Sequence, residues 1–151
     1  MSHDIVSHLD DRDVQVVAQA PVLVFLLVSA ADGAIDKREI KRFAALLSGT
    51  SFSDLMAVMQ RARLSIVDAL RQLSENQVDY LAELQRIARV LDSRLPAKLA
   101  LRVKSQLYRL GHGIATSSDQ VAESAGERIS EQERIALKVI AGLICIDEHQ
   151  C

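Results

Sequence analysis

Apolar residues recur along the chain at steps of three and four, which places them on one face of an α-helix. One such stripe predicts a single helix over 53–73; it consists of Leu55, Met59, Ala62, Ile66, Leu70 and Leu73. A second stripe predicts a helix over 77–93; it consists of Leu81, Leu84, Ala88 and Leu91. No segment alternates for long between apolar and polar residues, so we expect no strands.

Two more stripes lie in the C-terminal half. The first opens at Pro96 and is expected to end at Gly111 and Gly113; it consists of Leu99, Val103, Leu107 and Leu110. The second follows Ser130; it consists of Ala136, Val139, Ile140, Leu143 and Ile144. A short helix is also predicted near 118–125. Helices joined by short loops predict an all-α fold, a compact bundle of about six to seven helices.

The most apolar part of the chain predicts a helical segment over 13–31, which Pro21 either kinks or restarts, because proline lacks an N–H but suits a first helical turn. Its dense apolar run is only Pro21–Val28, whereas a membrane span needs about 20 mainly apolar residues. We therefore interpret it as a buried central helix, and membrane association is not expected. Residues 1–12 are polar and predict a mobile tail, leaving 13–151 as one domain.

Charge and cysteine content exclude several classes of protein. The net charge is -2 and no block of basic residues stands out, so no nucleic-acid partner is expected. A weak basic stripe is interpreted as a solvated helix face; it consists of Arg94, Lys98, Arg102, Lys104 and Arg109. The two cysteines, Cys145 and Cys151, predict no disulfide framework. We expect a reducing, cytoplasmic location.

An internal repeat relates residues 31–39 to residues 125–133. Alanine, isoleucine and glutamate match at corresponding positions, and an apolar helix follows each copy. Asp36 stands three residues before Glu39, and Ser130 three residues before Glu133, which is the spacing of a helix capping box. The chain therefore contains two units of the form helix, acidic turn, helix, which we expect to be pseudo-symmetric.

This pattern resembles the TerB-like family, named for a bacterial tellurite-resistance protein, in which an apolar helix ends in Ala-Asp-Gly followed by Ile, a capping residue and Glu, given twice. The first copy matches closely, whereas Gly126 replaces the aspartate of the second copy and Glu127 replaces its glycine. The resemblance implies an all-helical fold and an acidic metal site. It implies Asp32, Glu39 and Glu133 as ligands, with Asp36 and Glu127 as weaker candidates.

The residues themselves leave two interpretations of the first acidic turn. Residues 32–39 fit the second half of an EF-hand loop, but Val28 and Ala30 stand where that loop needs oxygen ligands, and calcium prefers about 6–8 of them. Alternatively, Asp32 and Gly33 form a tight turn, and Asp36 and Glu39 cap the next helix. Calcium, magnesium or manganese remain the possible cations, and no catalytic residue is predicted.

Three functions are consistent with the sequence. The first is a non-enzymatic binding or scaffolding module with a protein partner, related to stress responses if the family resemblance extends that far. The second is a metal-dependent enzyme or metal-handling protein that uses the same acids. The third is a membrane-surface adaptor, which would require the apolar helix of residues 14–31 to be exposed. The sequence does not indicate the oligomeric state.

Overall fold

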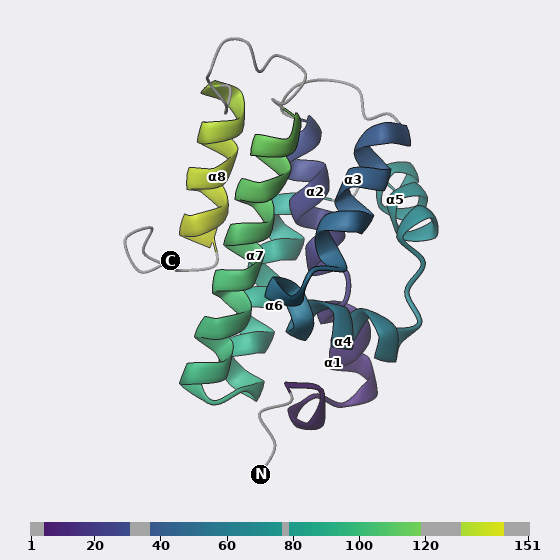
Figure 1. Ribbon diagram of the computed structural model, residues 1–151. Helices are drawn as coiled ribbons and strands as arrows, with labels where there is room; N and C mark the ends of the chain where they lie inside the picture. The colour runs from purple at the N-terminus through teal and green to yellow at the C-terminus, as the bar shows by residue number, and fades with distance from the viewer. Residues whose placement is uncertain (1–4, 31–36, 77–78, 119–130, 144–151) are drawn as a thin grey trace.

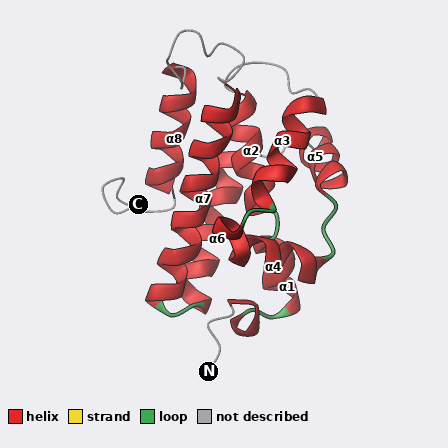
Figure 2. Cartoon of the chain, in the orientation of Figure 1, coloured by secondary structure: helices red, strands yellow, loops and turns green. Residues whose placement is uncertain are grey.

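The structure is a computed structural model that describes residues 5–30, 37–76, 79–118 and 131–143 (Figure 1). Every regular element in these ranges is helical, which confirms the predicted all-α bundle (Figure 2). The turns of both repeat units lie outside the described ranges. The elements are the 3₁₀ turns η1 (Ile5–His8) and η2 (Thr50–Phe52) and the helices α1 (Asp11–Val17), α2 (Ala20–Ala30), α3 (Lys37–Leu47), α4 (Ser53–Ala62), α5 (Ile66–Glu75), α6 (Tyr80–Arg94), α7 (Ala97–Ser118) and α8 (Glu131–Leu143).

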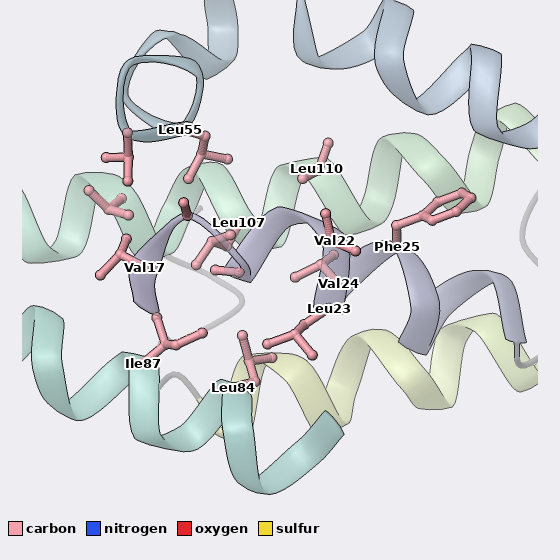
Figure 3. Packing of buried hydrophobic residues seen from close by; sticks show 14 of the residues in the cluster. Val17, Val22, Leu23, Val24, Phe25, Leu55, Leu84, Ile87, Leu107 and Leu110 are labelled. Carbon is pink, nitrogen blue, oxygen red and sulfur yellow. The ribbon is translucent and has the colours of Figure 1, made fainter. Parts of the chain in front are cut away.

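Helix α2 is the centre of the bundle. It packs most extensively against α7, and also against α6, α8 and α5. Val22, Leu23 and Val24 are fully buried although they point in different directions, because neighbouring helices cover α2 on several sides (Figure 3). The prediction of a buried central helix is therefore confirmed. Pro21 lies in the first turn of α2, so it restarts the helix after α1.

Residues Asp11–Ser29 are long and apolar enough to cross a membrane by length and composition alone. Most of this segment is buried inside the protein, and the core helix of a protein that never enters a membrane passes the same test. The stretch is therefore weak evidence for a membrane span.

The single helix predicted over 53–73 is wrong, because the segment forms two helices, α4 and α5. Arg63, which follows α4, adopts a left-handed conformation with φ 56°. Its N–H donates to Gln60 O at 3.1 Å, and the N–H of Leu64 donates to Met59 O at 3.0 Å. These two bonds form a Schellman motif, which ends a helix. The predicted stripe is still core: its members are buried except Ile66, which is partly buried.

The predicted end of the fifth helix at Gly111 and Gly113 is also wrong, since α7 continues to Ser118. These glycines are sites of close helix packing. A Cβ on Gly111 would lie 3.0 Å from Leu137 Cδ2 of α8, and one on Gly113 would lie 2.9 Å from Leu46 Cδ2 of α3. Glycine therefore lets α3 and α8 approach α7 closely, and it does so within a continuous helix.

The apolar stripes contain two errors. Leu81 is 40% exposed and Val139 is 39% exposed, so neither belongs to the core. Helix α8 buries Leu137, Ile140 and Ala141, so Ile140 is confirmed as core, whereas the burial of Leu137 and Ala141 was not predicted. Ile144 lies outside the described residues, and the predicted helix 118–125 lies largely outside them. The structure also buries Ile5 and Leu9 in the core, whereas residues 1–12 were expected to form a mobile tail.

Candidate functional site

Five acids were predicted as metal ligands, and the structure describes the side chain of Glu39 among them. Asp32, Asp36 and Glu127 lie outside the described residues, and Glu133 is described in its backbone only. Helix α3 begins at the residue after Asp36, and α8 begins at the residue after Ser130. Both helix starts therefore agree with the predicted capping boxes, and Glu39 and Glu133 each lie in a first helical turn.

Glu39 is partly buried beside the junction of α2, α3 and α7. It lines a small cavity together with Phe25 and Ser29 of α2, Ile114 of α7, and Arg42, Phe43 and Leu46 of α3. The cavity volume is ≈ 10 Å³, which is about the space that one water occupies. Glu39 therefore borders a cavity with room for about one water and no room for an organic substrate.

Aromatic packing holds α3 in this position. The rings of Phe25 and Phe43 stack with centroids 4.5 Å apart and an interplanar angle of 11°. Each ring is 1% exposed, so the pair is part of the core. The stack places the first turn of α3 next to the end of α2, and Glu39 is one turn before Phe43 on the same helix. The position of Glu39 is therefore determined by the core.

The helix ends that flank the two repeat turns lie at one end of the bundle. In Figure 1, the C-terminal ends of α2 and α7 and the N-terminal ends of α3 and α8 all lie at the top. Helices α3 and α8 both pack against α7. Within the described part of the chain, no group of three or more His, Cys, Asp or Glu side chains gathers where it could hold a metal ion. Any such group would therefore have to include residues outside the described ranges, among which are the acids of the two turns.

A larger cleft of ≈ 460 Å³ lies elsewhere, among α1, the α4–α5 junction, α5 and α6. One wall carries Gln15 and Gln19. The wall formed by α5 carries Asp68 and Gln72, and Asn76 follows at its C-terminal cap. The other lining residues are Ala62, Arg63, Leu64, Ser65, Ala69, Leu73 and Glu83. The cleft is thus mainly polar; its apolar surface comes from buried Ala62, Ala69 and Leu73 and partly buried Leu64.

Local capping interactions build the corner of this cleft. Gln15 Nε2 donates to Ala62 O at 3.3 Å, which ties α1 to the last turn of α4. Ser65 caps α5, because its Oγ accepts a hydrogen bond from the N–H of Asp68 at 3.3 Å. Sequence analysis missed this corner, although Ser65 and Asp68 have the spacing of a capping box. That spacing was the available signal that a new helix begins at Ile66.

Two members of the basic stripe, Arg102 and Lys104 of α7, form partly buried ion pairs, so the interpretation of the stripe as a solvated face is wrong for these two. Arg102 Nε and Nη2 donate to Asp54 Oδ2 and Oδ1 at 2.6 and 3.0 Å. Gln106 Nε2 donates to Asp54 Oδ2 at 2.8 Å. The Lys104 side chain is 7% exposed and its Nζ donates to Asp92 at 2.6 Å. These contacts join α4 and α6 to α7.

A third ion pair joins α1 to α6. Arg94 Nε lies 3.0 Å from Asp13 Oδ2, yet this oxygen accepts no hydrogen bond. The two charges therefore attract each other without a well-aligned N–H···O bond. Asp10 caps α1 by accepting a hydrogen bond from the N–H of Asp13 at 2.8 Å. That hydrogen bond lowers the pKa of the Asp10 carboxyl, and the charge of Arg94 adds a smaller effect in the same direction.

No protein-family model, curated protein or solved structure matches this chain. The likeness to the TerB-like family therefore rests on the residues of the repeat, chiefly Ala31–Glu39.

Proposed function

We propose that the protein is a non-enzymatic, TerB-like binding and scaffolding module whose acidic turns hold a divalent cation. The observation that carries the proposal is the position of Glu39. It lies at the first turn of α3, beside a water-sized cavity at the meeting point of α2, α3 and α7. Residues 31–36 join α2 to α3, so Asp32 in this connection and Glu39 in the first turn of α3 are close along the chain.

Carboxylate oxygens are the ligands that calcium, magnesium and manganese prefer. Asp32 and Glu39 belong to the first repeat unit. Glu133 lies in the first helical turn of α8, and the start of α8 lies at the same end of the bundle as the start of α3. A cation held by all three carboxylates would link the two repeat units, whose helices α3 and α8 both pack against α7. In this proposal the ion stabilises a surface that contacts a protein partner in the cytoplasm.

The second candidate, a metal-dependent enzyme or metal-handling protein, uses the same acids. An enzyme of this kind needs room for a substrate next to its metal ion. The cavity beside Glu39 has room for about one water, which favours a structural ion over a catalytic one. The third candidate, a membrane-surface adaptor, required an exposed apolar helix over 14–31, and most of that segment is buried.

Thermal unfolding with calcium, magnesium, manganese or a chelator tests the proposal. A cation that binds only the folded state raises its stability by ~2.7 kcal/mol at roughly a hundred times its dissociation constant. Asp32→Asn and Glu39→Gln should remove this gain yet leave the unfolding midpoint in chelator nearly unchanged, because Asn suits turns and Gln serves in a capping box. Glu75→Gln, an exposed acid at the end of α5, is the matched control and should keep the gain.

Two results would contradict the proposal. In the first, no cation shifts the midpoint of the parent protein beyond the effect of ionic strength. In the second, the shift persists in Asp32→Asn and Glu39→Gln and is therefore due to acids elsewhere. Either result would make the turns capping structures only.

A further inference from the structure

We propose that the cleft among α1, α5 and α6 binds an extended peptide segment that carries an acidic side chain. The inference rests on the proposed function, because it identifies the surface through which a binding module contacts a protein. The cleft is built by elements other than α3, α7 and α8. Peptide binding and cation binding are therefore separate properties that can be tested independently.

The size of the cleft suits a ligand. Its volume of ≈ 460 Å³ falls within the range of roughly 300–1,000 Å³ that is typical of ligand sites. Most such sites are lined by apolar side chains, whereas this one is lined mainly by amides, charged groups and a hydroxyl. A ligand that fills it must therefore offer many hydrogen-bonding groups.

The spacing of the amides favours an extended polypeptide over other polar ligands. Gln15 and Gln19 are four residues apart, and so are Gln72 and Asn76. Gln72 lies in the last turn of α5 and Asn76 at its C-cap, where four helical residues rise by about 6 Å, whereas Gln19 lies in the turn after α1. Two residues of an extended strand advance by about 6.6 Å, and alternate peptide groups face the same side. Since a side-chain amide offers both a donor and an acceptor, the α5 wall can pair with every second peptide group of one strand.

The charges of the cleft favour an acidic side chain on that peptide. Arg71 Nη2 donates to Asp68 Oδ1 at 3.1 Å, and Arg86 Nη1 donates to Glu83 Oε1 at 3.2 Å, so both acids of the lining already have a cationic partner. Arg63 makes no ion pair with any residue that the structure describes. Its guanidinium is exposed and can hold a carboxylate with two parallel hydrogen bonds.

The backbone of Arg63 is the second observation that points to this residue. It is the non-glycine residue with positive φ among the described positions, and it occupies the place in a Schellman motif where glycine is preferred. A side chain in the left-handed region costs roughly 1 kcal/mol or more. Such strain concentrates at binding sites, where the side chain serves a purpose other than stability. Here that purpose is to hold the guanidinium at the corner of the cleft.

The experiment uses two pools of blocked octapeptides with the full-length, ¹⁵N-labelled protein. Both pools are degenerate, but without aspartate and glutamate, at every position except one, which is glutamate in the first pool and glutamine in the second. The readout is the side-chain amide resonances of Gln15, Gln19, Gln72 and Asn76. Addition of the glutamate pool should shift these four resonances, and the side-chain amide of Gln85, an exposed α6 residue outside the cleft, should stay unchanged.

Variants then test which arginine binds the acidic side chain of the peptide. Arg63→Gln should weaken binding of the glutamate pool by about tenfold, to the level of the glutamine pool, because the charge-assisted pair is lost. Arg89→Gln, which removes an exposed arginine of α6 outside the cleft, should leave binding unchanged. Arg63→Gly should weaken binding in the same way without lowering the unfolding midpoint, since glycine adopts positive φ freely.

Three results would overturn the inference. In the first, neither pool shifts the cleft amides; in the second, Arg63→Gln binds the glutamate pool as tightly as the parent protein does. In the third, maltohexaose or a single-stranded oligonucleotide shifts the cleft amides and the peptides do not. Failure here leaves the cation-dependent unfolding midpoint intact. Failure of the proposed cation site instead leaves the peptide shifts intact, so the two failures are distinguishable.

Discussion

The contact of Asp54 with α7 offers the sharpest test of how the bundle is held together. Asp54 lies in the first turn of α4 and is 9% exposed. Its carboxylate accepts two hydrogen bonds from Arg102 and one from Gln106, and Gln106 Oε1 in turn accepts from the N–H of Leu55 at 3.4 Å. Asp54→Ala removes the acceptor on which Arg102 and Gln106 converge.

The magnitude follows from what each partner can do afterwards. The side chain of Arg102 is 38% exposed, so its freed guanidinium reaches water and the loss of its charge pair is screened. Gln106 is 5% exposed, so its amide stays buried without an acceptor, which costs about 1–3 kcal/mol. Together these effects predict that Asp54→Ala lowers the free energy of unfolding by about 2–4 kcal/mol.

Urea unfolding followed by circular dichroism measures this change. Asp68→Ala is the matched control, because Asp68 also lies in a first helical turn and pairs with an arginine, but that pair is exposed and should contribute about 1 kcal/mol or less. The reasoning would be refuted if Asp54→Ala cost no more than Asp68→Ala. A large loss in Asp54→Ala with no change in Gln106→Ala would also refute the convergent geometry.

Three other predictions address packing and charge. Leu70→Ala should cost about 2–5 kcal/mol in urea unfolding, because Leu70 is buried in the core, and a change below about 0.5 kcal/mol would mean that its face is exposed. Gly111→Ala should destabilise the protein by about 1–3 kcal/mol, because its Cβ would meet Leu137, whereas Gly142→Ala meets nothing within 4 Å and should be neutral or stabilising. Because folding lowers the pKa of Asp10, its contribution to stability is present above its ordinary pKa and is lost as the pH falls through the lowered value. Asp10→Asn, which still caps α1, should make the unfolding midpoint fall less steeply as the pH is lowered. An unchanged fall would mean that other carboxylates cause it.

Local signals in the sequence were sufficient for the starts of α3 and α8 and for most of the core. Asp36 and Ser130, each followed by a glutamate at the third position, predicted the starts of α3 and α8. The apolar spacing predicted most of the buried faces, because an amphipathic helix must place its apolar side inward. Pro21 predicted an interruption of the central helix, either a kink or a restart, for an equally local reason, and the structure shows the restart.

The errors arose where packing between distant segments decides. The sequence does not distinguish a glycine that ends a helix from one that lets another helix approach closely. Gly111 and Gly113 were therefore predicted to end the helix, whereas they lie against Leu137 and Leu46. The helix break at Arg63 is a different case, because it lacks a glycine and its local signal was the spacing of Ser65 and Asp68. The cleft was missed for a related reason: its walls come from α1 and α5, and no periodicity within either helix shows that they meet.

The central claim is that one divalent cation binds between the two acidic turns, and paramagnetic broadening by manganese tests it most directly. Substoichiometric Mn²⁺ is added to the ¹⁵N-labelled protein, and chelator restores the spectrum as a control. The account predicts that backbone amide signals of residues 32–39 and 127–133 broaden first. Broadening confined to the acid-rich segment Asp10–Asp13, or spread evenly over the exposed acids, would contradict it.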